Sequence, residues 1–188
     1  MNDAQLQAAL NARGYDTGGP GWGPKVAAAL AKGLRDPAFR AELMAFRVSP
    51  NFTLGELLKS ATADARKILN LPNAQQLGAL RALCVNVLEP VRARFGPVRI
   101  TSGFRIFTPD SQHGKGEAAD FEVPGISNRT VAEWIRDTLR FDQLILEAYS
   151  KSDPNAGWIH CSYRADRARK SVLRTPTGGA PYWAGLGS

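Results

Sequence analysis

Apolar residues recur three and four positions apart through the first part of the chain, in stretches separated by glycine and proline. This spacing places apolar side chains on one face of a helix. It predicts three helices, over residues 4–13, 24–30 and 36–46. Pro24 and Pro37 suit the first turn of the second and third helices, because an amide hydrogen there would have no partner within the helix. Residues 1–48 are therefore expected to form a small helical unit.

The longest helical pattern covers residues 74–95, where leucine and valine form a single stripe. Pro90 is expected to bend this helix and Gly96 to end it. Upstream, Thr53 and Glu56 have the spacing of a capping box, in which each side chain satisfies an unpaired backbone amide. A second unit of the chain therefore begins shortly before Thr53.

After Pro97 the pattern changes from helical to alternating, which predicts a β-strand over residues 98–102. A helix over residues 130–139 and two strands, over 141–149 and 157–163, are expected to follow. Helices come first and strands later, without regular alternation. This order predicts an α+β fold, with a mostly antiparallel sheet and helices packed around it.

The composition is typical of a soluble globular protein, with 44% hydrophobic and 22% charged residues among 188. No apolar run approaches the roughly 18 residues of a membrane span, and the polar start of the chain does not resemble a signal peptide. We divide the chain into a helical unit over 1–48, a second unit over 49–174 and a loose tail, rich in glycine and proline, over 175–188. We expect a monomer, with Cys84 and Cys161 as buried thiols.

The net charge of +7 and the isoelectric point near 9.8 favour an anionic partner, such as nucleic acid, a membrane surface or a cell wall. The basic residues are scattered from Arg13 to Arg174. No recognised DNA-binding motif or aromatic–basic stacking platform accompanies them. Specific nucleic-acid binding is therefore the weakest of the functions that the charge suggests, and a salt-dependent gel shift would test it.

The two histidines of the chain, His113 and His160, lie in unusual settings. Glycines closely follow His113, so a loop can pass near its imidazole before Asp120 enters a strand. Strand alternation points His160 away from the apolar side of its own strand. Two histidines and an aspartate can bind zinc and leave a fourth position for water, which is the catalytic arrangement. The alternative is that each histidine is a hydrogen-bonded structural residue.

Further residues around these three complete a longer motif. The motif comprises Ser102–Arg105, Ser111, His113, Gly116, Ala118, Asp120, Trp158 and His160. This combination resembles the zinc D-alanyl-D-alanine peptidase family, which includes bacterial carboxypeptidases, dipeptidases and many phage endolysins, and which shares its fold with the hedgehog signalling domain. The resemblance covers residues 51–174, and the segment Asn51–Leu57 is similar to the opening of the phage-type branch. It implies that His113, Asp120 and His160 bind one zinc ion.

A reaction of this kind needs a carboxylate that takes a proton from water and passes it to the leaving amine. Many family members carry that carboxylate three residues before the last histidine, where this chain has Gly157. Glu147 is the better candidate, because hedgehog-like and phage-type relatives carry a similar Phe-Asp-x-x-x-x-Glu run ahead of a final His-Cys-Ser. A plain surface role is the alternative for Glu147, and Asp153 is a second candidate base.

The resemblance also implies a substrate-binding and catalytic role for Arg105, whose planar guanidinium can hold a substrate carboxylate or steady the transition state. A solvated surface charge is the alternative for this arginine. Ser111 is expected to donate a hydrogen bond to the substrate. Trp158 is expected to line the cleft, although its ring could equally belong to the core.

Taken together, the residues and the resemblance predict a zinc metallopeptidase that cuts a peptide bond in the stem peptides or cross-links of bacterial peptidoglycan. Without an export signal, a phage or prophage endolysin is expected, made in the cytoplasm and released to the wall by a holin. The alternatives are a host D-Ala-D-Ala carboxypeptidase that remodels the wall and a non-catalytic, zinc-containing module that binds it.

The N-terminal unit resembles a shortened peptidoglycan-binding helical module. The resemblance rests on the Leu6–Gly18 stretch and on Trp22–Pro24, but the usual first stretch of such modules is missing. A packing extension of the peptidase unit is the alternative.

Overall fold

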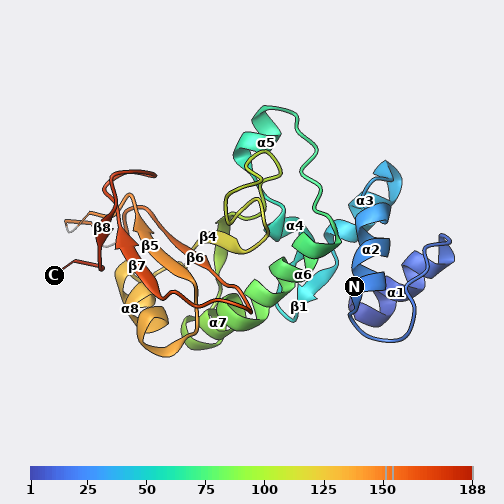
Figure 1. Cartoon of the computed structure of the whole chain (residues 1–188), viewed down its shortest axis with the longest axis horizontal. Helices are drawn as coiled ribbons and strands as arrows, with labels where there is room; N and C mark the ends of the chain where they lie inside the picture. The colour runs from blue at the N-terminus through green and yellow to red at the C-terminus, as the bar shows by residue number, and fades with distance from the viewer. Residues whose placement is uncertain (151, 154, 188) are drawn as a thin grey trace.

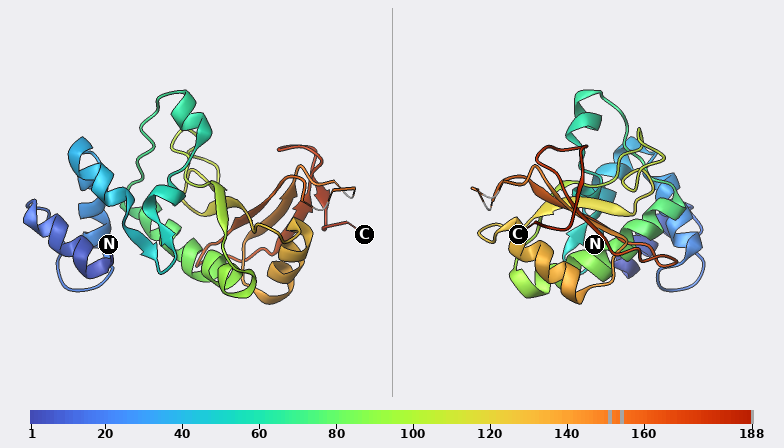
Figure 2. Two further views of the ribbon diagram at one scale, coloured as in Figure 1. Left: turned by 180° about the vertical axis from the view of Figure 1, so that it is seen from behind. Right: turned by 60° about the vertical axis from the view of Figure 1, so that its left-hand side comes forward.

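The computed structural model describes residues 1–150, 152–153 and 155–187. A group of helices lies at one end of the long axis and a twisted β-sheet at the other, with a helical rod between them (Figures 1 and 2). The two chain termini consequently lie toward opposite ends of the molecule (Figure 1). Within the described residues, no helix is long and apolar enough to cross a membrane.

The N-terminal group contains the three helices that the sequence pattern predicts. They are α1 (Asp3–Ala12), α2 (Pro24–Gly33) and α3 (Pro37–Met44). Asp36 caps α3, because its carboxylate accepts hydrogen bonds from the amides of Ala38 and Phe39 at 2.9 and 3.3 Å. Pro24 and Pro37 both lie in the first turn of their helices, as expected.

These helices pack directly against the rod, whose first segment is α6 (Ala74–Leu83). Arg81 of α6 forms a bidentate ion pair with Asp3, with both distances 2.9 Å, and its guanidinium lies 4.7 Å from the ring centre of Trp22. Trp22 in turn stacks on Phe46, with the ring centres 5.9 Å apart. Buried residues of the N-terminal group, the rod and the sheet form one continuous apolar cluster among the described residues. The N-terminal helices therefore extend the hydrophobic core of the chain.

A short hairpin and two short helices connect this group to the rod. They are β1 (Arg47–Ser49), β2 (Phe52–Thr53), α4 (Leu54–Leu57) and α5 (Ala61–Ala65). The predicted capping box is present at the start of α4. The Thr53 amide donates to the Glu56 carboxylate at 2.8 Å, and the Glu56 amide donates to the Thr53 hydroxyl at 3.3 Å.

The rod differs in detail from the single bent helix that the sequence predicts. After α6 comes a π-helical turn, η1 (Cys84–Leu88), and then α7 (Glu89–Phe95), which ends at Gly96. Proline lacks an amide hydrogen, and its ring clashes with the carbonyl four residues earlier, so Pro90 cannot continue the regular α-helical hydrogen bonds. The chain accommodates Pro90 by widening the preceding turn, and the Glu89 amide donates to the carbonyl of Cys84, five residues back.

Six strands form the main sheet within the described residues, in the order β3-β4-β6-β5-β7-β8. They are β3 (Arg99–Ser102), β4 (Ala118–Glu122), β5 (Gln143–Glu147), β6 (Trp158–Ser162), β7 (Ser171–Arg174) and β8 (Trp183–Ala184). All neighbouring strands are antiparallel except β5 and β7. The predicted α+β fold with a mostly antiparallel sheet is confirmed.

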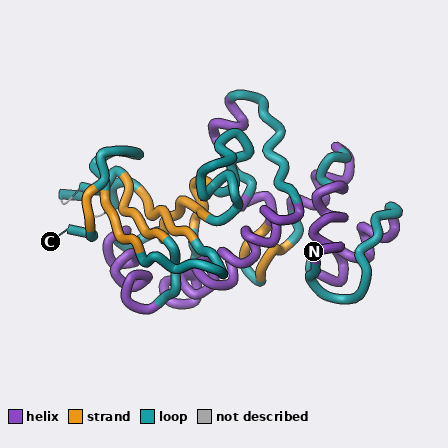
Figure 3. Tube along the Cα trace, in the orientation of Figure 1, coloured by secondary structure: helices purple, strands orange, loops and turns teal. Residues whose placement is uncertain are grey.

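Helices cover one face of this sheet (Figures 1 and 3). Helix α8 (Asn128–Thr138) packs on β5 and β6, and α7 lies beside it. It begins two residues before the predicted start, because Ser127 caps it there. Alternate residues of the central strands, including Leu144, Ile159 and Cys161, are fully buried on the helix side. Cys84 and Cys161 are free, buried thiols in the described part of the chain, as expected. The opposite face of the sheet carries the polar residues.

Part of the C-terminal segment, which is predicted to be a loose tail, has regular structure. β8 pairs with β7, and the Gly185 amide donates to the carbonyl of Val172 at 2.8 Å. Leu186 is buried in the apolar cluster. The residues around β8 are ordered by these contacts with β7 and the core, and they have no hydrophobic pattern from which a strand could be predicted. The domain boundaries after residues 48 and 174 stay predictions.

Candidate active site

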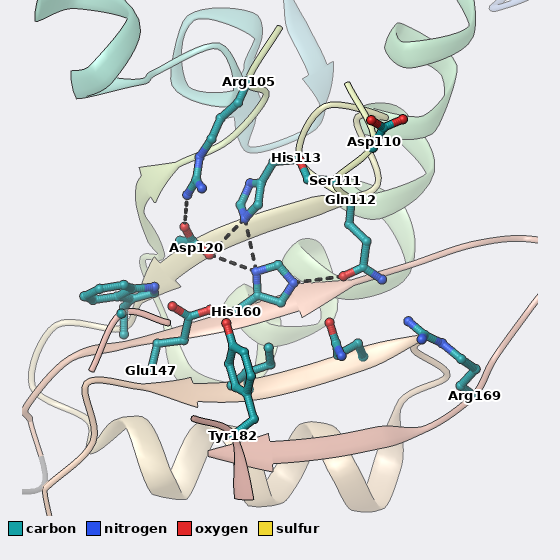
Figure 4. Close-up of a pocket in the computed structure, with 14 residues that line it drawn as sticks. Arg105, Asp110, Ser111, Gln112, His113, Asp120, Glu147, His160, Arg169 and Tyr182 are labelled. Atoms are coloured by element: carbon teal, nitrogen blue, oxygen red, sulfur yellow. Dashed lines mark hydrogen bonds and ion pairs between the residues drawn. The ribbon is translucent and has the colours of Figure 1, made fainter. Parts of the chain in front are cut away.

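The pairing of three strands brings the polar residues of the sheet together. Asp120 of β4 pairs with His160 of β6, and His160 pairs with Ile145 of β5. Two residues further along the same two strands, Trp158 pairs with Glu147. Since alternate residues of a strand point to the same face, these side chains all project from the face that the helices leave open (Figure 4).

His113 reaches the same place from the loop between β3 and β4. Its Nδ1–H donates to the carbonyl of Gly103 at 2.7 Å, which fixes the orientation of the ring. The loop folds tightly behind the imidazole, and a Cβ on Gly114 would lie only 1.9 Å from the carbonyl oxygen of Thr108. Ser111 stabilises the turn, because its hydroxyl donates to that same carbonyl at 2.8 Å and accepts from the Gly114 amide at 3.0 Å.

Three ligand atoms converge at the centre of the site. His160 Nδ1 lies 3.0 Å from Asp120 Oδ1 and 3.1 Å from His113 Nε2, and His113 Nε2 lies 3.2 Å from Asp120 Oδ1 (Figure 4). All three residues are buried, with exposed fractions of 4 to 6%. The structure therefore brings together the three residues predicted to bind metal.

The three converging atoms of this triad are suited to bind a cation. Carbonyl oxygens only accept hydrogen bonds, so the outer nitrogen of each imidazole carries the proton, His113 Nδ1 toward Gly103 and His160 Nε2 toward the side-chain oxygen of Gln112 at 3.1 Å. The inner nitrogens then face each other and a carboxylate with lone pairs only. Such an arrangement is repulsive by itself and becomes favourable around a metal ion. Two imidazoles and one carboxylate, with no further His, Cys, Asp or Glu in this group among the described residues, match an open zinc site.

Asp120 remains ionised in this setting. Its second oxygen pairs with the guanidinium of Arg105, whose Nε also donates to Ser102 Oγ at 2.9 Å. Arg105 therefore contacts a metal ligand directly, while its assigned role toward substrate stays a prediction.

Glu147 lies at the end of β5 with its carboxylate directed into the site beside His160 (Figure 4). Burial raises the pKa of Glu147, and the nearby charge of Asp120 raises it further, against the opposing charge of Arg105. A buried carboxylate with a raised pKa is a stronger base than an ordinary glutamate, which suits it to general acid–base chemistry. Asp153, the second candidate base, lies in an exposed turn, where its carboxylate accepts from the Asn155 amide at 3.0 Å.

These side chains line an open pocket of about 530 Å³. Arg105, Ser111 and Trp158, which were assigned to substrate, all line it, although the Ser111 hydroxyl is engaged by its own loop. The indole Nε1 of Trp158 is buried and has no hydrogen-bond partner among the described residues. Other members of the lining were missed from the sequence: Asp110, Gln112, Gln143, Ile145, Arg169, Gly178 and Tyr182.

Among the missed residues, only Gln112 carried a usable signal, since it lies within the motif next to His113. Tyr182 comes from the tail segment, and its hydroxyl points toward Glu147 and His160 (Figure 4). Burial raises the pKa of Tyr182, and the nearby charges of Glu147 and Asp120 raise it further, so its hydroxyl stays protonated near neutral pH.

A buried metal-binding triad beside a carboxylate, on the open face of an α+β sheet, is the arrangement of a metal-dependent hydrolase. A family model described as Peptidase M15 matches residues 50–162, a span that includes the triad, Arg105 and Glu147. Because the match covers more than half of the chain, the chain belongs to the peptidase M15 family. A comparison with curated proteins found no match. The predicted family and the predicted metallopeptidase activity are thereby confirmed.

Proposed function

We propose that the chain is a zinc-dependent peptidase that hydrolyses a peptide bond in the stem peptides or cross-links of bacterial peptidoglycan. The observation that carries this function is the convergence of His113 Nε2, Asp120 Oδ1 and His160 Nδ1 within 3.2 Å of one another, beside an accessible carboxylate. Zinc suits these ligands, and membership of the peptidase M15 family supports peptide hydrolysis.

The side chains around the triad divide the chemistry between them. Zinc, when bound, polarises a carbonyl and lowers the pKa of water. Glu147 takes the proton of the attacking water and returns it to the nitrogen of the leaving amine. Burial supports this role, because it raises the pKa of Glu147 and so makes its carboxylate a stronger base. Arg105 keeps Asp120 in its ionised, ligating form and offers its remaining donors to a carboxylate of the substrate.

The lining of the pocket favours an acidic, extended peptide. Arg105 and Arg169 place positive charge at two separate positions of the pocket wall, and stem peptides carry free carboxylates that such guanidinium groups bind. The net charge of +7 adds a long-range attraction to an anionic cell envelope.

We further propose that the enzyme acts as a phage or prophage endolysin, which accumulates in the cytoplasm and reaches the wall after a holin opens the membrane. The similarity of Asn51–Leu57 to the phage-type branch supports this role. A host carboxypeptidase that remodels the wall would use the same chemistry on a narrower substrate. Expression inside bacteria with and without a co-expressed holin distinguishes them, since an endolysin lyses cells only when the holin is present.

The decisive experiment is a mass-spectrometric digest of purified peptidoglycan, with and without a chelator, and again after zinc is restored. We expect new peptide termini that vanish on chelation and return with zinc, and their identity names the bond. Release of free D-alanine alone would indicate a carboxypeptidase, whereas separated stems or cross-links would indicate an endopeptidase. An intact wall in the presence of stoichiometric zinc would overturn the proposed substrate and favour a binding module.

A further inference from the structure

The outer nitrogen of His160 begins a chain of hydrogen bonds that leads away from the metal triad. His160 Nε2 donates to Gln112 Oε1 at 3.1 Å, and Gln112 Nε2 donates to Asp142 Oδ2 at 2.9 Å. Asp142 immediately precedes β5, and its side chain is completely buried. The Asp142 carboxylate therefore lies two hydrogen bonds away from a metal ligand.

Two arginines hold Asp142 in place. Arg167 donates from Nε and Nη2 to its two oxygens at 3.0 and 3.1 Å, and Arg169 donates from Nε and Nη2 at 2.9 and 2.6 Å. The Arg169 amide adds a further hydrogen bond at 3.3 Å. Burial alone would raise the pKa of Asp142, but these hydrogen bonds outweigh it and hold the pKa well below its usual range. Asp142 is consequently an ionised group that can only accept hydrogen bonds.

Because Asp142 can only accept hydrogen bonds, it fixes the direction of each hydrogen bond from Gln112 to His160. An amide next to an acceptor-only carboxylate must present its NH₂ group to it, so Gln112 turns its oxygen toward His160. An amide oxygen also only accepts, so His160 must carry its proton on Nε2. We propose that Asp142 is a positioning residue that, through Gln112, selects the tautomer of His160 whose Nδ1 lone pair faces the metal. This inference deepens the proposed function, since it rests on metal binding by the triad.

His113 provides an internal contrast. Its outer nitrogen donates to a backbone carbonyl, that of Gly103, at 2.7 Å. Side-chain substitution cannot change the acceptor character of that group. The tautomer of His160 depends instead on two replaceable side chains, Gln112 and Asp142. Without them, the Asp120 carboxylate, 3.0 Å from His160 Nδ1, would favour a proton on Nδ1, the nitrogen that must be free to bind metal.

Two variants test the inference, Asp142→Ala and Gln112→Leu. Neither variant leaves a buried, unpaired positive charge, because the side chains of Arg167 and Arg169 are 45% and 44% exposed and can be solvated. The zinc dissociation constant, measured by competition with a chromogenic chelator, is expected to rise about 10- to 100-fold in Gln112→Leu. A rise of about tenfold or more is expected in Asp142→Ala. Gln143→Leu, which alters another glutamine of the same pocket, should leave zinc affinity unchanged.

The double variant separates positioning from general destabilisation. If Asp142 acts through Gln112, Asp142→Ala should have almost no further effect on zinc affinity in a Gln112→Leu background. A structural effect of Asp142 on the fold would instead add to that of Gln112→Leu. Additive losses of zinc affinity would therefore overturn the inference.

Nitrogen NMR of the metal-free protein, at a pH well above the ordinary histidine pKa, reads the tautomers directly. We expect the Nε2–H form of His160 in the wild type and a shift toward Nδ1–H in both variants, with His113 remaining Nδ1–H throughout. An unchanged His160 tautomer in both variants would overturn the inference. Neither readout uses peptide cleavage, so a protein that shows these shifts but leaves peptidoglycan intact would overturn only the proposed function.

Discussion

A Cβ atom on Gly157 would lie 1.7 Å from the carbonyl oxygen of Glu147. Gly157 also has a φ of +70°, a conformation that residues with side chains rarely adopt. The position three residues before the last histidine therefore has no room for the carboxylate that many family members carry there. In this chain the carboxylate of the site comes from the neighbouring strand, on Glu147 itself.

Gly157→Ala should destabilise the fold strongly. The left-handed backbone conformation costs roughly 1–2 kcal/mol for a residue with a side chain, and the contact with the Glu147 backbone must be relieved by moving β5 or β6. We expect a loss of about 3 kcal/mol or more in the free energy of unfolding, measured by urea denaturation. Gly125→Ala is the matched control, because Gly125 has a φ of +81° but nothing within 4 Å of the added Cβ. Equal losses in the two variants would show that the close approach to Glu147 does not contribute to the free energy of unfolding.

Glu147→Gln should keep zinc and lose nearly all turnover. The substitution preserves the shape of the side chain and removes only its ability to accept and return a proton, a contribution of about 10²- to 10⁴-fold in rate. The measurement is kcat on a peptidoglycan fragment, together with the zinc content of the purified variant.

Asp153→Asn is the control for that experiment. Its carboxylate lies in an exposed turn and accepts from the Asn155 amide, so the variant should retain the wild-type rate. Retention of half the wild-type rate by Glu147→Gln would exclude Glu147 as the base. A large loss in Asp153→Asn would transfer that role to Asp153.

The local pattern of the chain was sufficient to predict the fold class, and the metal triad was predicted from the resemblance of a longer motif to a known peptidase family. The α+β architecture follows from the change of hydrophobic period after Pro97, and strand alternation correctly places His160 on the polar face of β6. Asp120 and His113 belong to one continuous motif, so their proximity needs only a tight loop and the start of β4. Both signals are short in range, which is why they can be read without a structure.

Features that depend on contacts between distant segments could not be predicted in this way. The hydrogen bonds from His160 through Gln112 to Asp142 join three separate parts of the chain, and no spacing rule connects them. Tyr182 reaches the pocket only because β8 pairs with β7, and a strand of two residues has no readable period. The π-helical turn before Pro90 is likewise one of several ways in which a helix can accommodate proline.

Glu89→Gln should lower stability in a pH-dependent manner. The Glu89 carboxylate accepts from the Ser49 hydroxyl at 2.7 Å and from the Asn51 amide and side chain at 2.8 Å, and so joins α7 to the β1–β2 hairpin. Although burial raises the pKa of Glu89, these hydrogen bonds outweigh it and leave the pKa below its ordinary value. A group with a lowered pKa in the folded state stabilises above its unfolded pKa, about 4.3, and loses that contribution as the pH falls further.

The difference in unfolding free energy between wild type and Glu89→Gln should therefore be about 1–2 kcal/mol near neutral pH and should narrow below about pH 4. Urea denaturation across this pH range measures it. Glu133→Gln is the control, because Glu133 makes a half-exposed ion pair with Arg129 within one helix, and its effect should be within about 0.5 kcal/mol. A difference for Glu89→Gln that grows as the pH falls would contradict the sign of the shift.

Zinc removal should lower the thermal stability of the wild type but not that of His160→Ala. A ligand that binds only the folded state stabilises it by about 4 kcal/mol at a thousandfold excess over its dissociation constant, which corresponds to roughly 10 °C in Tm for a chain of this size. His160→Ala removes one of three converging ligands and should lose the metal, the activity and the zinc-dependent rise in Tm together. Asp137→Asn alters an exposed carboxylate paired with Arg136 and should keep the full rise, which controls for loose binding of zinc to the surface. A full equivalent of zinc bound to His160→Ala would contradict the ligand set.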